Sequence, residues 1–172
     1  MFFGDDRRVV VDLPQASLEV WWGQAQGFAD ADACVAFAGG EVSAGPLRTE
    51  VTGLVVRLPS GRLLRLGNTV TSPVLAHITD DTWTLRGRGL GYTVEVEGWA
   101  PLADAHVLPV PLVEQRGPTP GALEHLGGTL AVKVRRGSRV VWRGESAVAG
   151  LEHGSLAKAA DASARLGGRA YG

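Results

Sequence analysis

The chain has 172 residues, of which 45% are hydrophobic and 20% are charged, as in an ordinary globular protein. Its 17 Lys and Arg residues against 18 Asp and Glu residues give a net charge of −1, which removes the electrostatic case for a nucleic-acid or anionic-membrane partner. The single cysteine, Cys34, excludes an internal disulfide and any multi-cysteine zinc or iron–sulfur site.

The length predicts one domain spanning residues 1–172. The N-terminal Met1-Phe2-Phe3 is followed at once by charged residues, which leaves no apolar region of the kind a secretory signal needs. No apolar stretch approaches the roughly 20 residues of a membrane-spanning helix. We therefore expect a cytoplasmic protein without a transmembrane segment.

Short runs rich in valine, separated by glycine and proline, dominate the chain and predict about ten β-strands. The clearest run is 92–97, where Tyr92, Val94 and Val96 alternate with polar residues, as in a strand with one buried face. In chain order, the expected strands span residues 7–13, 18–22, 33–37, 51–58, 62–66, 74–78, 82–86, 92–97, 129–136 and 139–149.

The last two expected strands are separated by Gly137-Ser138, which predicts a two-residue hairpin turn. One helix is expected at 155–166, with Ser155 as its N-cap and Gly167-Gly168 as its end. Residues 108–121 are rich in proline, and we expect a long irregular connection there because proline cannot pair inside a sheet. Together these features favour an antiparallel all-β sandwich or barrel.

Motifs for nucleotide and acyl-transfer chemistry are missing. The glycine-rich residues 87–91 precede an expected strand, whereas a dinucleotide fingerprint opens a helix. No Gly-x-Ser-x-Gly nucleophile elbow occurs. Cys34 lies in a strand-like apolar run, which favours a small buried side chain over a nucleophile.

The histidines give no support for a metal site. No two of them have the spacing of metal ligands, so we predict no metal, and we expect no cofactor. A structural role is the more common fate of a single histidine. The four are His77, His106, His125 and His153.

Glu95 and Glu97 lie on one face of the expected strand at 92–97, because side chains two residues apart on a strand point the same way. Neighbouring carboxylates raise each other's pKa and can act in acid–base chemistry. A solvated face, or ion pairs with Lys133 or Arg135 on a neighbouring strand, is the more common role of such a pair.

The aromatic residues are few and fall in groups along the chain. In a β-barrel they would either line a cavity for one small ligand or fill the core, and core filling is more common. They are Trp21, Trp22, Phe28 and Phe37, then Trp83, Tyr92 and Trp99, then Trp142.

Three segments, taken in order, resemble the tocopherol cyclase family. The first is WWGQAQGF at 21–28 with the Phe37-Ala38-Gly39-Gly40 turn, similar to the family's Trp-x-x-Gln segment. The second is VEVEGWAP at 94–101, followed by Asp104 and the Leu-Pro-x-Pro loop at 108–111. The third is GGTLAVKV at 127–134, followed by a closing segment that ends in Leu151-Glu152-His153-Gly154.

The resemblance implies a lipocalin-like β-barrel that corresponds to the later part of family members, which carry another β-rich half before it. It matches Trp22, Gln24, Asp104 and Glu152 to family positions. The chain departs from the family at 64–68, where the family's Phe-x-Pro-Trp-Asn is missing, and at 124–126, where a family cysteine is missing.

The family chemistry is the protonation of a prenyl alkene, followed by capture of the cation by a phenol oxygen to close a chroman ring. It needs an acid with a raised pKa, and Asp104, Glu50, Glu97 and Glu95 are the candidates. The cation needs an aromatic face. We expect Gln24 to orient the phenol. The expected ligand-binding residues are Trp22, Gln24, Phe28, Trp83 and Trp99.

Three functions follow as hypotheses. The first is a tocopherol cyclase-like protein that binds, and cyclises, a prenylated quinol or similar hydrophobic small molecule in a barrel cavity. The second is a non-catalytic β-barrel that binds a hydrophobic ligand. The third is a structural half-unit, completed by a homodimer or a partner chain.

Overall fold

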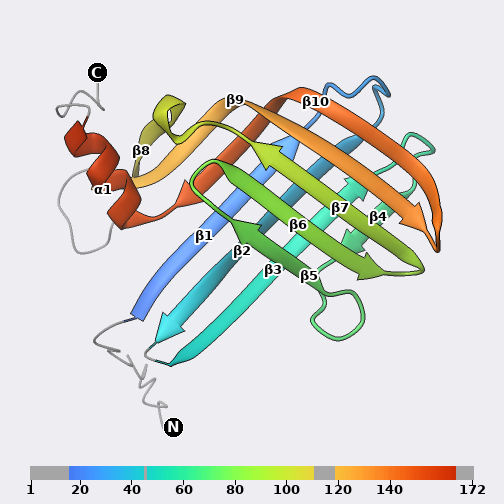
Figure 1. Ribbon diagram of the computed structural model, residues 1–172, viewed down its shortest axis with the longest axis horizontal. Coiled ribbons are helices and arrows are strands. Elements are labelled where there is room, and N and C mark those ends of the chain that lie inside the picture. Colours follow the sequence, from blue (N-terminus) through green and yellow to red (C-terminus); the bar gives the residue numbers. More distant parts are fainter. Residues whose placement is uncertain (1–15, 45, 111–118, 166–172) are drawn as a thin grey trace, which may run out of the picture.

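The computed structural model describes residues 16–44, 46–110 and 119–165, and the strand expected at 7–13 lies outside them. Figure 1 shows one strongly curved sheet with a helix at one end. The elements are β1 (Ala16–Ala25), β2 (Cys34–Ala44), β3 (Leu47–Arg57), β4 (Leu63–Leu66), β5 (Val74–Ile78), β6 (Thr82–Gly89), β7 (Tyr92–Trp99), η1 (Leu102–Asp104), β8 (His106–Val110), β9 (Thr119–Arg136), β10 (Arg139–Gly154) and α1 (Leu156–Arg165).

Strand pairing follows a meander whose two halves are joined by the first and last strands. The order is β4-β3-β2-β1-β10-β9-β7-β6-β5, and β8 pairs with β9 off this path. Every neighbouring pair is antiparallel. In Figure 1, β6 and β7 cross in front of β1–β3, while β9 and β10 curve round to connect the two layers. The prediction of an antiparallel all-β fold with a short C-terminal helix is confirmed.

The sheet is open between β4 and β5, where the described residues form no ladder. The path contains nine strands that alternate in direction, so its first and last members, β4 and β5, run the same way. Parallel neighbours need a crossover of a dozen or more residues, whereas only residues 67–73 connect these two strands. The odd number of strands therefore explains why this edge does not close as a hairpin.

Side-chain contacts bridge the open edge. A Cβ added at Gly87 of β6 would lie 2.7 Å from Leu66 Cδ1 of β4, so any other residue there would force the Leu66 side chain to move. The Glu50 carboxylate of β3 accepts a hydrogen bond from the Ala76 backbone N–H of β5 at 3.1 Å. The two ends of the sheet therefore lie next to each other without sharing a backbone ladder.

Inward-facing side chains from both halves of the sheet form the main hydrophobic core, and a smaller cluster that includes Leu123 lies against α1. Alternate residues are buried along each strand, as in Tyr92, Val94 and Val96 of β7, and this confirms the alternation expected at 92–97. The most deeply buried large side chains are Trp83, Leu54, Leu64, Leu85, Leu123, Leu130 and Leu151. The interior positions of the described strands are thus occupied by packed apolar groups.

Helix α1 packs against one end of the sheet. Its Ala159 is buried with Leu123 of β9 and Val107 of β8. Lys158 Nζ forms an ion pair with Asp80 Oδ1 at 2.8 Å, in the turn between β5 and β6. The helix thereby links the C-terminal end of the chain to the β5–β6 hairpin. No helix among the described residues has the length and apolarity to cross a bilayer.

Two expectations are wrong. Residues 108–110 and 119–121 of the expected irregular connection lie in β8 and β9, where Pro109 pairs with Pro120 beside a register shift after Leu108, and residues 111–118 are outside the described ranges. These prolines are tolerated because β8 pairs on one side only. Cys34 is exposed rather than buried. Its neighbours Ala33 and Val35 are buried, so the alternation of the strand turns Cys34 outward.

Candidate functional site

The outer face of β6, β7, β9 and β10 carries a hollow of about 650 Å³. Its volume lies within the range of small-molecule sites, roughly 300–1,000 Å³. The lining combines hydroxyl groups, carboxylates, small residues and one large aromatic: Thr82, Thr84, Glu97, Gly98, Trp99, Thr129, Leu130, Ala131, Glu145, Ser146 and Ala147.

Register explains why this surface is hollow. Ala131 of β9 pairs with Glu97 of β7 on one side and with Glu145 of β10 on the other. A methyl group therefore lies between two longer side chains whose backbones are two strand spacings, about 10 Å, apart. The row continues to Thr84 of β6. Short side chains form the floor, and the carboxylates form two walls.

A second hollow of about 480 Å³ adjoins the first and shares Glu97, Ala131 and Glu145 with it. We call the two hollows together the outer groove. The second hollow is lined in addition by Ala29, Glu95, Val132, Lys133, Arg143 and Gly144. The basic residues thus lie at one end of the outer groove and Trp99 at the other.

The two glutamates of β7, Glu95 and Glu97, have different surroundings in the structure. Glu95 lies 3.8 Å from Lys133 Nζ and 3.9 Å from Arg135 Nη2, so the predicted cross-strand ion pairs form at this position. Glu97 takes part in no ion pair among the described residues. Its carboxylate faces the outer groove.

Trp99 is 52% exposed at the end of β7, although tryptophan is usually well buried. It lies on the same face as Glu97, and Thr129 Oγ1 donates a 3.5 Å hydrogen bond to its backbone carbonyl. The indole thus offers a large apolar surface to solvent at the edge of the hollow.

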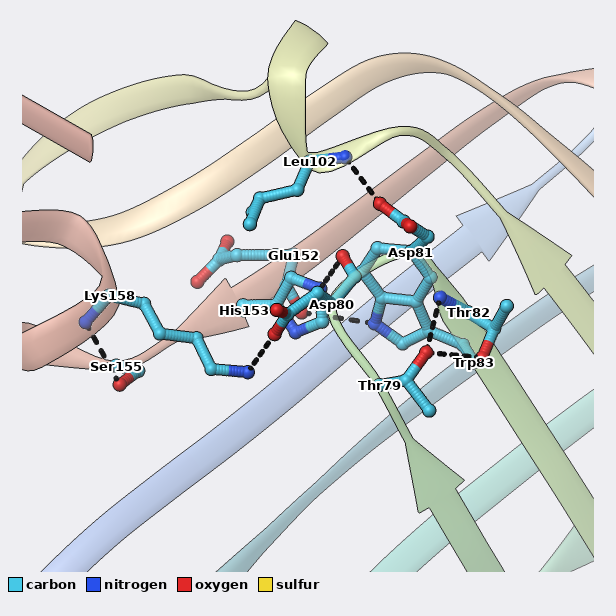
Figure 2. Close-up of polar contacts among 10 residues, drawn as sticks. All are labelled: Thr79, Asp80, Asp81, Thr82, Trp83, Leu102, Glu152, His153, Ser155 and Lys158. Carbon is cyan, nitrogen blue, oxygen red and sulfur yellow. Dashed lines mark hydrogen bonds and ion pairs between the residues drawn. The ribbon is translucent and has the colours of Figure 1, made fainter. Parts of the chain in front are cut away.

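The interior near α1 holds a second cluster in which aromatic and polar groups meet, and Figure 2 shows its Trp83 and His153 with their polar contacts. Trp83 is fully buried, stacks on His153 with ring centroids 4.3 Å apart, and meets His125 edge-on at 5.6 Å. Its Nε1 donates to the Glu152 carbonyl at 3.3 Å. His153 Nε2 lies 3.1 Å from the Asp80 carbonyl oxygen.

Burial is the main cause of the pKa shifts of the two histidines in this cluster. Removal from water lowers the pKa of His153 to about 4, although its hydrogen bond with the Asp80 backbone opposes the shift. Burial also lowers the pKa of His125, whose Nε2 has no hydrogen-bond partner among the residues that the structure describes. We infer that both rings are neutral near pH 7 and fill structural positions in the core.

A third group of candidate side chains lies on the outer face of β1, β10 and β9. Glu152 is half-buried and pairs in register with Trp22 on one side and Glu124 on the other. Burial, with a smaller contribution from Glu124, raises the pKa of Glu152. Gln24 lies two residues beyond Trp22, on the same face and opposite Gly150.

The predicted site residues fall into separate places. Glu97 and Trp99 meet at the outer groove, and Trp22 and Gln24 meet beside Glu152. The side chains of the others face neither place: Trp83 is in the core, where it bonds to the Glu152 backbone carbonyl, Phe28 is buried edge-on to Trp142 at 5.3 Å, Glu50 is at the open edge, and Asp104 is exposed in η1.

Sequence reasoning missed Glu145 as a groove residue. In a regular hairpin with its turn at Gly137-Ser138, Ala131 would pair with Gly144, and the Glu145 side chain would point inward. An irregularity between Val140 and Trp142 shifts the register by one residue and brings Glu145 opposite Ala131. No local sequence signal marks this shift.

Comparison with known proteins found no matching family model, no matching curated protein and no matching solved structure. The described residues contain no group of three or more His, Cys, Asp or Glu side chains arranged to hold a metal ion. The resemblance to the tocopherol cyclase family therefore rests on the motifs quoted above.

Proposed function

We propose that this chain binds a small molecule with an apolar body in the outer groove, without transforming it. The observation that carries the proposal is the hollow of about 650 Å³ floored by Ala131 and Ala147 and bordered by the half-exposed Trp99. A flat apolar surface beside a space of ligand size is typical of small-molecule sites.

In this proposal the ligand lies outside the sheet and not in a barrel cavity, because the inward positions of the strands hold the core cluster. A lipocalin-like barrel remains our proposal for the origin of the sheet. It is supported by the meander order and by the approach of Leu66 to Gly87 across the open edge.

The test is a titration with N-phenyl-1-naphthylamine, a neutral dye whose emission rises in apolar surroundings. Wild-type protein is expected to give saturable enhancement. Trp99→Ala should weaken binding roughly fivefold or more, since exposed aromatic anchors carry much of the binding energy. Ala131→Leu should also weaken it, because the larger side chain fills the floor between Glu97 and Glu145.

Leu75→Ala is the matched control, since Leu75 is a large apolar residue, 70% exposed on β5, and is not part of the groove lining. Each variant is first compared with the wild type by urea denaturation. Saturable binding that Trp99→Ala and Ala131→Leu leave unchanged, or no binding at all, would refute the groove as the site.

One observation supports cyclase-like chemistry as a second candidate function. The half-buried Glu152, whose pKa is raised, lies directly opposite Trp22, and Gln24 shares their face. In that function Glu152 donates its proton to the prenyl alkene, Trp22 stabilises the cation, and Gln24 orients the phenol. The phenol oxygen then bonds to the cation and loses its proton, so the chroman has the mass of the quinol.

Chromatography of the protein incubated with a quinol carrying a trisubstituted prenyl chain tests this candidate. The expected product is a chroman formed by the wild type, and Glu152→Gln should abolish its formation. Asp161→Asn, which removes an exposed carboxylate of α1, is the control and should retain it. Chroman formation equal to that of a protein-free blank would exclude cyclisation.

A further inference from the structure

Two carboxylates face the middle of the outer groove, between its Trp99 end and its basic end. Glu97 and Glu145 face the first hollow from opposite sides, and neither forms an ion pair among the described residues. The next row differs, because there Glu95 is balanced by Lys133 and Arg135. No Lys or Arg lines the first hollow, whereas Lys133 and Arg143 line the adjoining second hollow, so the first hollow itself contains two carboxylates and no cationic side chain.

The aromatic residue of the same hollow suits the same kind of ligand. The face of a tryptophan ring carries partial negative charge and attracts cations more strongly than any other side-chain ring. Trp99 borders the hollow directly and follows Glu97 by two residues on one face of β7. An aromatic face and two carboxylates therefore surround one space.

From this arrangement we propose that the ligand of the outer groove is an organic cation, an alkylated ammonium group attached to an apolar body. The proposal rests on the proposed binding function and adds the charge of the ligand. The cationic group lies over Ala131, between Glu97 and Glu145 and beside Trp99, and the apolar body lies in the rest of the first hollow. A neutral or anionic ligand of the same shape would displace water from two carboxylates without replacing its interactions.

Two isosteric probes separate charge from shape. They are 3-(trimethylammonio)phenol and 3-tert-butylphenol, which differ in a positively charged nitrogen against a neutral carbon. Binding is followed in NMR spectra through the indole N–H signal of Trp99, assigned with Trp99→Phe. The wild type is expected to bind the cation roughly tenfold more tightly than the neutral probe, with a preference that falls as salt is added.

The double variant Glu97→Gln, Glu145→Gln should bring the two affinities to within about twofold, since glutamine retains size and removes charge. Asp161→Asn serves as the control for a lost carboxylate outside the groove, and urea denaturation verifies that each variant is folded. Equal binding of both probes at Trp99 in the wild type would overturn the cation proposal and leave the groove proposal standing. If neither probe moves the Trp99 signal, the groove proposal fails as well.

Discussion

The buried His153 makes a specific pH dependence of stability unavoidable. Its pKa is about 4 in the folded chain against a usual value of 6.5, and the side chain is 3% exposed. As pH falls below about 6.5, the unfolded chain takes up a proton that the folded chain refuses until about pH 4. Stability is therefore lost across that window and the loss levels off below it.

The size of the effect follows from these two values. Linkage between pH 7.5 and pH 5 gives a loss of about 2 kcal/mol of unfolding free energy from His153 alone. His125 acts in the same direction, because burial lowers its pKa too. Asp80 has a lowered pKa, owing to Lys158, and its contribution is lost only below the usual carboxylate value of 3.8, outside this interval.

The assay is urea denaturation, followed by tryptophan fluorescence, at pH 7.5 and pH 5 for the wild type and His153→Gln. Glutamine retains a donor for the Asp80 carbonyl and does not titrate, so the variant should be less stable at pH 7.5 but lose about 2 kcal/mol less on acidification. His77→Gln, at an exposed position of β5, should behave as the wild type.

Equal losses in the wild type and His153→Gln would refute the reasoning. Should the variant not fold, an NMR titration of the wild-type His153 ring gives the same answer. A midpoint near 6.5 would show that the ring is not held neutral by burial.

Two further predictions concern packing and the helix. Gly23→Ala should lower the free energy of unfolding by about 1–3 kcal/mol, because the added Cβ would overlap the Phe37 ring. Gly127→Ala should cost far less, because no atom lies within 4 Å of its new Cβ, and similar urea midpoints for the two variants would contradict this account. Lys158→Ala should lower the free energy of unfolding by less than about 1 kcal/mol, because the ion pair of Lys158 with Asp80 is partly exposed. The loss should be larger at low salt than at high salt, since salt screens the pair. A loss of several kcal/mol that does not depend on salt would be inconsistent with this explanation.

The alternation of the chain by itself determined most of the secondary structure. The strand expected at 74–78 matches β5, and the strand at 92–97 lies within β7, because a face buried on one side needs an apolar residue at every second position. The turn at Gly137-Ser138 and the helix after Ser155 were likewise readable from local preferences. Strand ends were less accurate, since pairing partners extended β9 and β10 well beyond their apolar runs.

Only the tertiary structure decided where the candidate groups meet. The outer groove depends on which residues of β7, β9 and β10 stand side by side, and a one-residue register shift after Val140 is what turns Glu145 outward. The open edge between β4 and β5 depends on whether the whole path contains an odd or an even number of strands. Register and strand direction are properties of pairs that are distant in sequence, so no local pattern encodes them, whereas alternation and turns act between neighbouring residues.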